Sequence, residues 1–235
     1  MSDPLVRIRA NLNEIRARMG EAARRSRRDP GDVALVAVTK TVGEGEVRAL
    51  VEAGCSLLAE SRPQQLWDKA RLVADLPIRW HMIGHLQRNK VRRTLPLVEM
   101  VQSADSPTLI AALDQHAAEL GMRLPILVEV NTSREPAKHG FTPEQIGPWL
   151  PELAGYAHVQ VRGLMCMASL EGGLEAARRD FAALRKLRDR LRPHCPEGVC
   201  LDELSMGMSG DFEVAIEEGA TMVRIGSALF EGLGP

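Results

Sequence analysis

The sequence has few of the features that mark a membrane, secreted or metal-binding protein. No apolar run approaches the ~18 residues of a membrane span. Residues 1–10 carry charges and no apolar core, so no secretory signal is expected. Only four of the 235 residues are cysteines, none in a Cys-x-x-Cys pair or beside histidines at zinc-ligand spacing. We therefore expect reduced thiols in a soluble, cytoplasmic protein.

The chain also lacks an excess of charge of either sign. Its 30 basic and 31 acidic residues give a net charge of −1, so neither nucleic acid nor a membrane is expected as a partner. Arginines do gather in residues 7–28, "RIRANLNEIRARMGEAARRSRR". We interpret this segment as the solvated face of a helix, and a polyanion-binding patch is the alternative.

What the chain does contain is a regular alternation of short apolar runs and helical segments. Eight runs predict strands, at residues 32–40, 55–61, 78–84, 97–105, 125–132, 159–169, 203–209 and 221–230. Nearly all are separated by helical segments, which predicts an α/β fold with a parallel sheet wrapped by helices. Eight such units in a chain of this length favour a closed (β/α)₈ TIM-type barrel over an open sheet. No G-x-G-x-x-G loop follows the first run.

No low-complexity linker divides the sequence. We expect a single domain over residues 1–235, with an extra N-terminal helix at 5–26 and the barrel at 32–232. Barrels carry their ligand sites at the carboxyl ends of the strands. Residues suited to binding stand at those predicted ends, among them Lys40, Glu60, Ser61, His81, Gly84, Asn131 and Arg224.

Lys40 is the sharpest of these residues, because it directly follows the apolar run "LVAVT". We expect burial at the barrel mouth, which lowers an ammonium pKa and frees an amine for Schiff-base formation with a carbonyl. The alternative is a lysine that reaches solvent and only pairs with a carboxylate. Glu60 is a candidate acid/base partner of Lys40, or a structural partner at the rim.

Two loops of small residues predict a phosphate site. Ser205, Gly207, Met208 and Ser209 precede a helix expected from Gly210 onward, and Gly226 and Ser227 follow the eighth run. Loops after strands 7 and 8 commonly bind phosphate in such barrels, and small residues let backbone amides approach the oxygens. Either loop alone could be only a turn. Both on one rim favour phosphate binding.

Long motifs across residues 32–232 closely resemble the pyridoxal phosphate homeostasis protein family, whose barrels are similar to the N-terminal domain of alanine racemase. The motifs are "LVAVTK", "LAESRPQQ", "RWHMIGHLQRNK", "EVNTSREPAKHGF", "VRGLMCMAS" and "SMGMSGDFEVAIEEGATMVRIGSALF". The second motif departs from the family, which usually has Gly before its Glu and often Asn after it. This chain has Ala59 and Ser61 there, and serine has a shorter reach than asparagine.

The resemblance implies a binding site for pyridoxal 5′-phosphate (PLP). Lys40 would hold the cofactor as a Schiff base, and Arg224 would lie against the pyridine nitrogen. The residues implied around the phosphate are Ser205, Gly207, Met208, Ser209, Gly226 and Ser227. His81 and Ser61 would flank the ring, and we expect Gly84 in the same site.

Arg224 limits the chemistry that this site would support. Arginine is a donor only and stays protonated, so the pyridine nitrogen would remain unprotonated and the ring a poor electron sink. Aminotransferases and decarboxylases place an aspartate there instead. In the racemase relatives a second acid/base depends on an added C-terminal domain, which we do not expect here. Tyr156, the single tyrosine, is expected away from the rim.

We therefore expect a PLP-binding protein, a monomer without established turnover. It would act in intracellular PLP (vitamin B6) homeostasis and supply PLP to apoenzymes. A slow PLP-dependent amino-acid racemase is one alternative. A barrel that binds another phosphorylated metabolite, with Lys40 as a mere charge, is the other.

Further residues near the predicted rim stay open between two interpretations. His85, Gln87 and Asn89 look functional by resemblance, although their composition alone would suit an ordinary helix start. Lys138 and His139 either cover the barrel mouth or lie in an exposed loop.

Overall fold

The computed structural model describes residues 3–135 and 138–233 and forms a closed parallel barrel of eight strands in sequential order. The strands are β1 (Ala34–Val38), β2 (Leu57–Glu60), β3 (Arg79–Met82), β4 (Met100–Ala104), β5 (Leu124–Glu129), β6 (Val159–Met165), β7 (Glu203–Ser205) and β8 (Met222–Ile225). Closure comes from the pairing of β1 with β8, in which Ala34 lies opposite Met222. The predicted barrel is thus confirmed.

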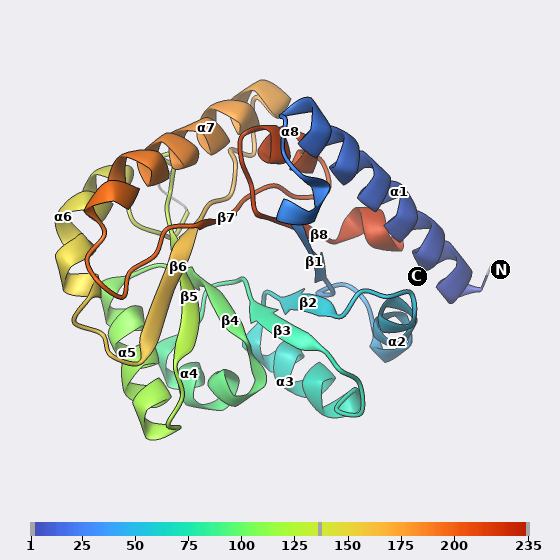
Figure 1. The fold of residues 1–235 in the computed structure, drawn as a ribbon. Coiled ribbons are helices and arrows are strands. Elements are labelled where there is room, and N and C mark those ends of the chain that lie inside the picture. Colours follow the sequence, from blue (N-terminus) through green and yellow to red (C-terminus); the bar gives the residue numbers. More distant parts are fainter. Residues whose placement is uncertain (1–2, 136–137, 234–235) are drawn as a thin grey trace.

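Helices surround the strands (Figure 1). They are α1 (Pro4–Arg25), α2 (Glu44–Glu52), α3 (Pro63–Leu72), α4 (Arg88–Thr94), α5 (Pro107–Glu119), α6 (Pro143–Leu153), α7 (Gly173–Leu191) and α8 (Phe212–Glu217). Four 3₁₀ turns complete the elements: η1 (Pro30–Asp32), η2 (Leu95–Leu97), η3 (Arg192–His194) and η4 (Ser227–Phe230). Among the described residues, none of the helices combines the length and apolar character needed to cross a membrane.

The arginine-rich N-terminal segment forms α1, which packs outside the barrel against α2, α8 and η4. Asp3 caps its start by accepting a hydrogen bond from the Leu5 amide at 3.0 Å. Several arginines bind α8: Arg18 pairs with Glu213 at 3.2 Å, and Arg25 donates to the Glu217 carboxylate at 3.0 Å. These arginines therefore tie α1 to the barrel, which supports a structural interpretation of that segment.

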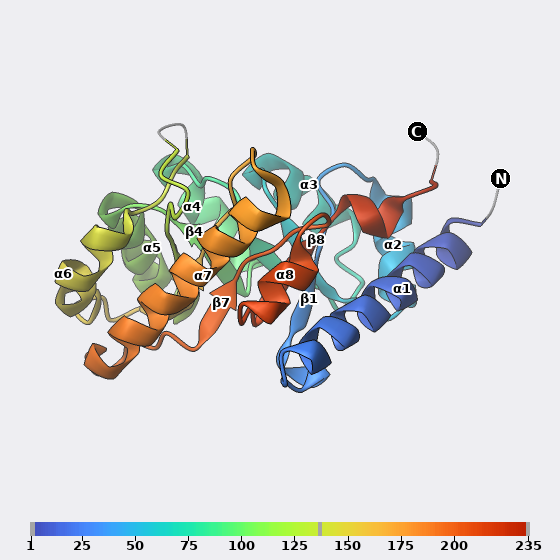
Figure 2. The ribbon, with the colours of Figure 1, turned by 90° about the horizontal axis from the view of Figure 1, so that it is seen from above.

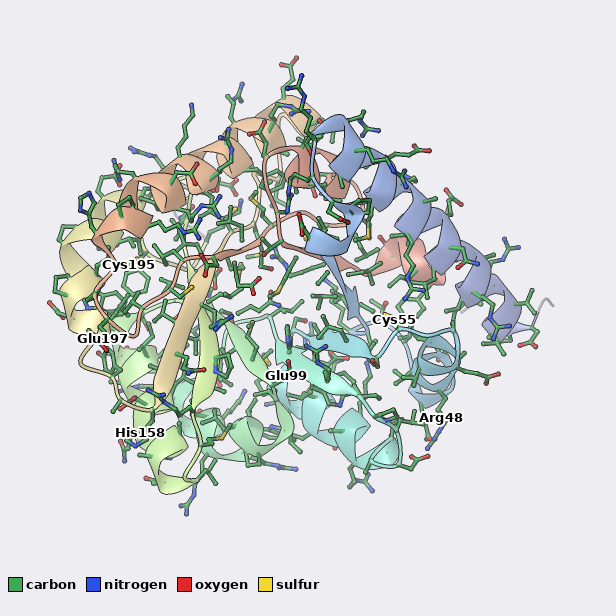
Figure 3. All side chains as sticks on the ribbon, viewed as in Figure 1. Arg48, Cys55, Glu99, His158, Cys195 and Glu197 are labelled. Atoms are coloured by element: carbon green, nitrogen blue, oxygen red, sulfur yellow. The ribbon has the colours of Figure 1, made fainter. Side chains whose placement is uncertain are left out.

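The two ends of the barrel are different. In Figure 2 the β6–α7 loop lies at the top and the end of α1, which leads to β1, lies at the bottom. Figure 3 labels Cys55, Glu99 and His158, which stand shortly before β2, β4 and β6, around one face of the barrel. That face carries the amino ends of the strands, so the carboxyl ends that position a ligand site lie on the opposite side.

Alternation along the strands sets which side chains fill the barrel. The inward cluster is apolar and contains Val36, Ala59, Met100, Leu127, Met165 and Met222, and a larger core lies between strands and helices. Because parity continues along each strand, His81, Gln102, Glu129, Ser205 and Arg224 also point inward. These polar groups lie level with parts of the apolar cluster: His81 is opposite Ala59 and Met100, and Ser205 is opposite Met165 and Met222.

Candidate functional site

A cavity of about 480 Å³ opens at the carboxyl ends of the strands. Eight of the eleven residues predicted to bind the cofactor line it, namely Lys40, Ser61, Gly84, Met208, Ser209, Arg224, Gly226 and Ser227. His81, Ser205 and Gly207 are absent from the described lining. The volume lies within the usual ~300–1,000 Å³ range of small-molecule pockets.

Lys40 stands in the turn just after β1, and its side chain is exposed at the cavity. The expectation that Lys40 is buried was therefore wrong. The buried position belongs to Thr39, whose hydroxyl donates to Glu60 at 2.7 Å and whose amide donates to the Ala59 carbonyl at 3.1 Å. These bonds fix the backbone that carries Lys40, while its amine reaches the opening.

Glu60 faces the helix layer, because its neighbour Ala59 occupies the inward position of β2. Its carboxylate pairs with Lys69 of α3 at 2.5 Å, and Lys69 also donates to the Thr39 carbonyl. The fully buried Glu60 therefore supports the Lys40 turn from behind. This pairing with Lys69 excludes Lys40 as the partner of Glu60 and favours the structural interpretation, although the pair lies behind the rim.

Arg224 forms the inner wall of the cavity and is only 4% exposed. Its guanidinium donates to the Ser205 hydroxyl at 2.6 Å and to the Cys166 carbonyl at 2.8 Å. Its Nε–H makes no hydrogen bond with any part of the chain that the structure describes. Burial lowers the pKa of Arg224, yet an arginine stays protonated in proteins. The cavity thus has one fixed, buried donor.

A chain of buried hydrogen bonds continues from Arg224 into the barrel. Ser205 accepts from Arg224 and donates to Gln102 Oε1 at 2.7 Å, and the Gln102 amide lies 2.8 Å from His81 Nδ1. An amide nitrogen is a donor only, so Nδ1 accepts and the imidazole is neutral. Burial lowers the pKa of His81 to about 4, which agrees with this assignment. His81 and Ser205 thus lie beneath the cavity as supports.

Small residues shape the wall on the side of strands 7 and 8. The amides of Gly226 and Ala228 both point at the Ser209 hydroxyl, at 3.3 and 3.4 Å. The Met208 amide is held by Asp211 at 2.6 Å. Gly207 lies behind this wall, where an added Cβ would come within 2.5 Å of Ala215 in α8. Because the Ser209 hydroxyl accepts from both amides, its own O–H is left to donate, as an anion would require.

Gly84 and Ser61 close the wall between β2 and β3. An added Cβ on Gly84 would lie 2.1 Å from the Ser61 carbonyl oxygen, a distance that no side chain tolerates. Glycine at position 84 therefore lets the ends of β2 and β3 approach, and it keeps this part of the cavity open.

Sequence reasoning missed one lining residue of clear chemical interest, Glu129. It is 4% exposed, on β5, and lines the cavity. Burial, reinforced by the charge of Asp105 and opposed by Arg224 and His85, raises the pKa of Glu129 to about 7. The strand was expected to present Asn131 instead, but the Asn131 amide donates to the Glu135 carbonyl at 2.9 Å.

Two histidines cover the same side of the cavity. The rings of His85 and His139 stack with centroids 4.3 Å apart, and His85 Nδ1 lies 2.6 Å from an Asp105 oxygen. Both histidines line the cavity. The structure therefore favours the interpretation in which His139 covers the mouth. Lys138 turns away and donates to the Ala168 carbonyl at 2.8 Å.

Comparison with known proteins first identifies the class of barrel to which this chain belongs. Residues 5–233 match the family model for the alanine racemase N-terminal domain. An alanine racemase from Clostridium difficile superposes with a TM-score of 0.72 over 94% of this chain and 56% of its own, at 17% identity. That similarity shows the fold alone.

More similar relatives identify the family within this class. A pyridoxal phosphate homeostasis protein from Aquifex aeolicus is 36% identical over 93% of this chain and 95% of its own length. The structure of PipY from Synechococcus elongatus with PLP bound superposes with a TM-score of 0.84 at 34% identity, over 95% of this chain and 99% of that one. The chain belongs to the pyridoxal phosphate homeostasis protein family.

Proposed function

We propose that this chain binds PLP as a Schiff base on Lys40, acts in PLP homeostasis and supplies the cofactor to PLP-dependent apoenzymes. The observation that carries the proposal is the shared cavity of Lys40, Arg224 and the Ser209 loop. The PLP-bound structure of PipY, a relative with the same barrel, supports it. We expect the protein to act as a monomer.

The residues present fit three polar groups of PLP, which are the aldehyde, the ring nitrogen and the phosphate. Lys40 offers an exposed amine, the Nε–H of Arg224 is a free donor for the ring nitrogen, and Ser209, Gly226 and Ser227 surround an anion position. When bound, PLP supplies an aldehyde carbon that reacts with amines. Arg224 cannot protonate the ring nitrogen by giving up its own proton under ordinary conditions, so the site holds the cofactor without the activation that aminotransferases use.

A slow amino-acid racemase is the second candidate, and Glu129 favours it. The expectation of no second acid/base rested on the added domain of the racemases, which was not expected here, and on Tyr156, which packs against Trp149 outside the cavity. Glu129 supplies an acid inside the cavity instead. Exchange of Cα hydrogen for deuterium in common amino acids, well above the rate with free PLP, would establish this activity.

Reduction of the PLP-loaded protein with borohydride, followed by peptide mass mapping, tests the main proposal. We expect one pyridoxyl group on Lys40 and none on Lys138, the other lysine near the rim. Lys40→Arg keeps the charge and should lose the adduct and the absorbance band, whereas the exposed Lys186→Arg should retain both. Full, tight PLP binding by Lys40→Arg would instead support a site that uses Lys40 only as a charge.

A further inference from the structure

One wall of the cavity carries basic residues and the opposite wall carries an acidic one. Lys40 follows β1 and Arg224 lies on the neighbouring β8. Glu129 lies on β5, across the ring of eight strands from β1. No hydrogen bond joins the Glu129 carboxyl to residues 3–135 or 138–233. Its oxygens are open to the cavity, and its charged form is costly because the side chain is otherwise buried. A carboxyl with a raised pKa that faces a ligand cavity indicates a functional role, such as binding a ligand or transferring a proton.

The surroundings of Glu129 hold it in place. Gly140 has φ of +106°, and a Cβ there would lie 2.8 Å from the Glu129 carbonyl oxygen and 3.1 Å from its Cγ. The turn at His139 and Gly140 therefore closes directly over this side chain. Asp105, bonded to His85, adds a second negative group nearby. The wall suits a small cation that donates hydrogen bonds.

We propose that Glu129 binds the ammonium group of a small primary amine, such as a free amino acid, and takes a proton from it so that the amine displaces Lys40 from PLP. This inference rests on the proposed function. It identifies the class of molecule that removes the cofactor from its lysine, so that loss of PLP depends on amines in solution.

The exchange balances without any redox change. The Glu129 carboxylate accepts one proton from R–NH₃⁺, and the freed lone pair of R–NH₂ adds to the carbon that is doubly bonded to the Lys40 nitrogen. The two protons left on the incoming nitrogen pass to the lysine nitrogen, the bond from the carbon to Lys40 breaks, and the C=N bond to the amine forms. The lysine leaves as R′–NH₂ and takes up one proton from solvent, and Glu129 releases its proton to solvent. One ammonium group has replaced another.

A metal ion is the competing ligand for this wall. His85, Asp105 and His139 offer ligand atoms within 4.8 Å of one another. However, the two imidazole planes are only 13° from parallel and stacked at 4.3 Å. A metal bound by both rings must lie near both ring planes, which stacked rings do not permit. The observed arrangement therefore favours an amine.

The test measures loss of PLP from Lys40 with and without added amine. Protein loaded with PLP and freed of excess cofactor is mixed with L-alanine or with ethylamine, then reduced at intervals with borohydride. Mass mapping reports the pyridoxyl group on Lys40 or on the amine. For each variant, the rate with amine is divided by the rate without it.

We expect Glu129→Gln to lower this ratio by about a hundredfold or more, as for loss of an acid–base group. Glu144→Gln, on an exposed glutamate that pairs with Arg134, should retain the wild-type ratio. Glu129→Asp, which keeps the acid, should give an intermediate ratio. In the wild type the ratio should rise through pH 7, near the pKa of about 7 for Glu129, and this inflection should vanish in Glu129→Gln.

The outcomes separate the two proposals. No pyridoxyl group on Lys40 of the wild type overturns the proposed function and this inference with it. Normal labelling of Lys40, together with a wild-type ratio and pH profile in Glu129→Gln, overturns the role of Glu129 alone. Zn²⁺ binding by the unloaded protein that is lost in His85→Ala, with that same wild-type ratio, would assign the wall to a metal instead.

Discussion

Replacement of Gln102 by leucine tests whether the buried hydrogen-bond chain holds the cavity floor. Leucine is apolar and similar in size, so it removes both polar bonds of the amide. The Ser205 hydroxyl loses its acceptor, 2.7 Å away, and His81 Nδ1 loses its donor at 2.8 Å. Both groups are almost fully buried, so solvent cannot replace these partners.

The expected loss of stability follows from the two hydrogen bonds that the leucine removes. Each buried polar group left without a partner costs about 1–3 kcal/mol, so two of them lower the free energy of unfolding by about 2–6 kcal/mol. A domain of this size loses roughly 2–4 °C of Tm per kcal/mol, which gives a fall on the order of 10 °C. PLP affinity should also fall, because Ser205 anchors the guanidinium of Arg224.

Thermal and urea unfolding of the unloaded protein measure the first effect, and PLP titration measures the second. Gln115→Leu, the same change on the exposed face of α5, is the matched control and should be nearly neutral. Gln102→Glu keeps an acceptor for Ser205 but cannot donate to His81, so it should be relatively more stable at low pH, where His81 is protonated. A Gln102→Leu variant within about 0.5 kcal/mol of wild type would refute the reasoning.

Four further predictions concern the charged groups around the cavity. The pKa of His81 is lowered to about 4, so wild-type stability should fall by about 3 kcal/mol from pH 6.5 to 4, and His81→Gln should lessen this fall in urea unfolding. The pKa of Glu129 is raised to about 7, so the protein loses stability as this carboxyl comes to favour ionisation in the unfolded chain, between about pH 4.5 and 7. Glu129→Gln should thus gain up to about 3 kcal/mol at pH 8 and little at pH 4; equal gains at both pH values would contradict this. Lys69→Met leaves the buried Glu60 charge unpaired and should cost about 3–5 kcal/mol in chemical denaturation, so a neutral result would show that the pair does not form. Arg224→Glu should shift the absorbance of bound PLP by raising the ring nitrogen pKa, and an unchanged spectrum and affinity would place Arg224 elsewhere.

The barrel could be predicted because its signal is periodic and repeated. Eight apolar runs separated by helical segments leave few parallel arrangements, and their order around the ring then follows from short connections. The depth of each residue was harder to predict. His81 and Ser205 were placed at the rim because they end their strands, but both lie one inward position too deep. Ile83, two residues after His81, reaches the cavity instead.

The side chains of Lys40 and Glu60 lie elsewhere than the sequence predicted. Lys40 was expected to be buried because an apolar run precedes it, yet the buried position at the end of that run is taken by Thr39. Glu60 points outward, and its partner Lys69 comes from the following helix. A pairing of this kind depends on how α3 packs on the sheet, which no local spacing reveals. The inward position of Glu129, by contrast, follows from alternation with Leu127.

His81 and Glu129 differ in their relation to the cavity, and only Glu129 bears on its chemistry. Both are buried, inward-facing and shifted in pKa toward the neutral form. His81 has a donor for Nδ1 in Gln102 and lies outside the lining of this cavity, although its buried Nε2–H has no partner among the described residues. Glu129 has no hydrogen-bond partner among the described residues and faces the cavity. Because its ionisation above pH 7 destabilises the fold, the carboxyl is explained by what enters the cavity rather than by what holds the barrel together.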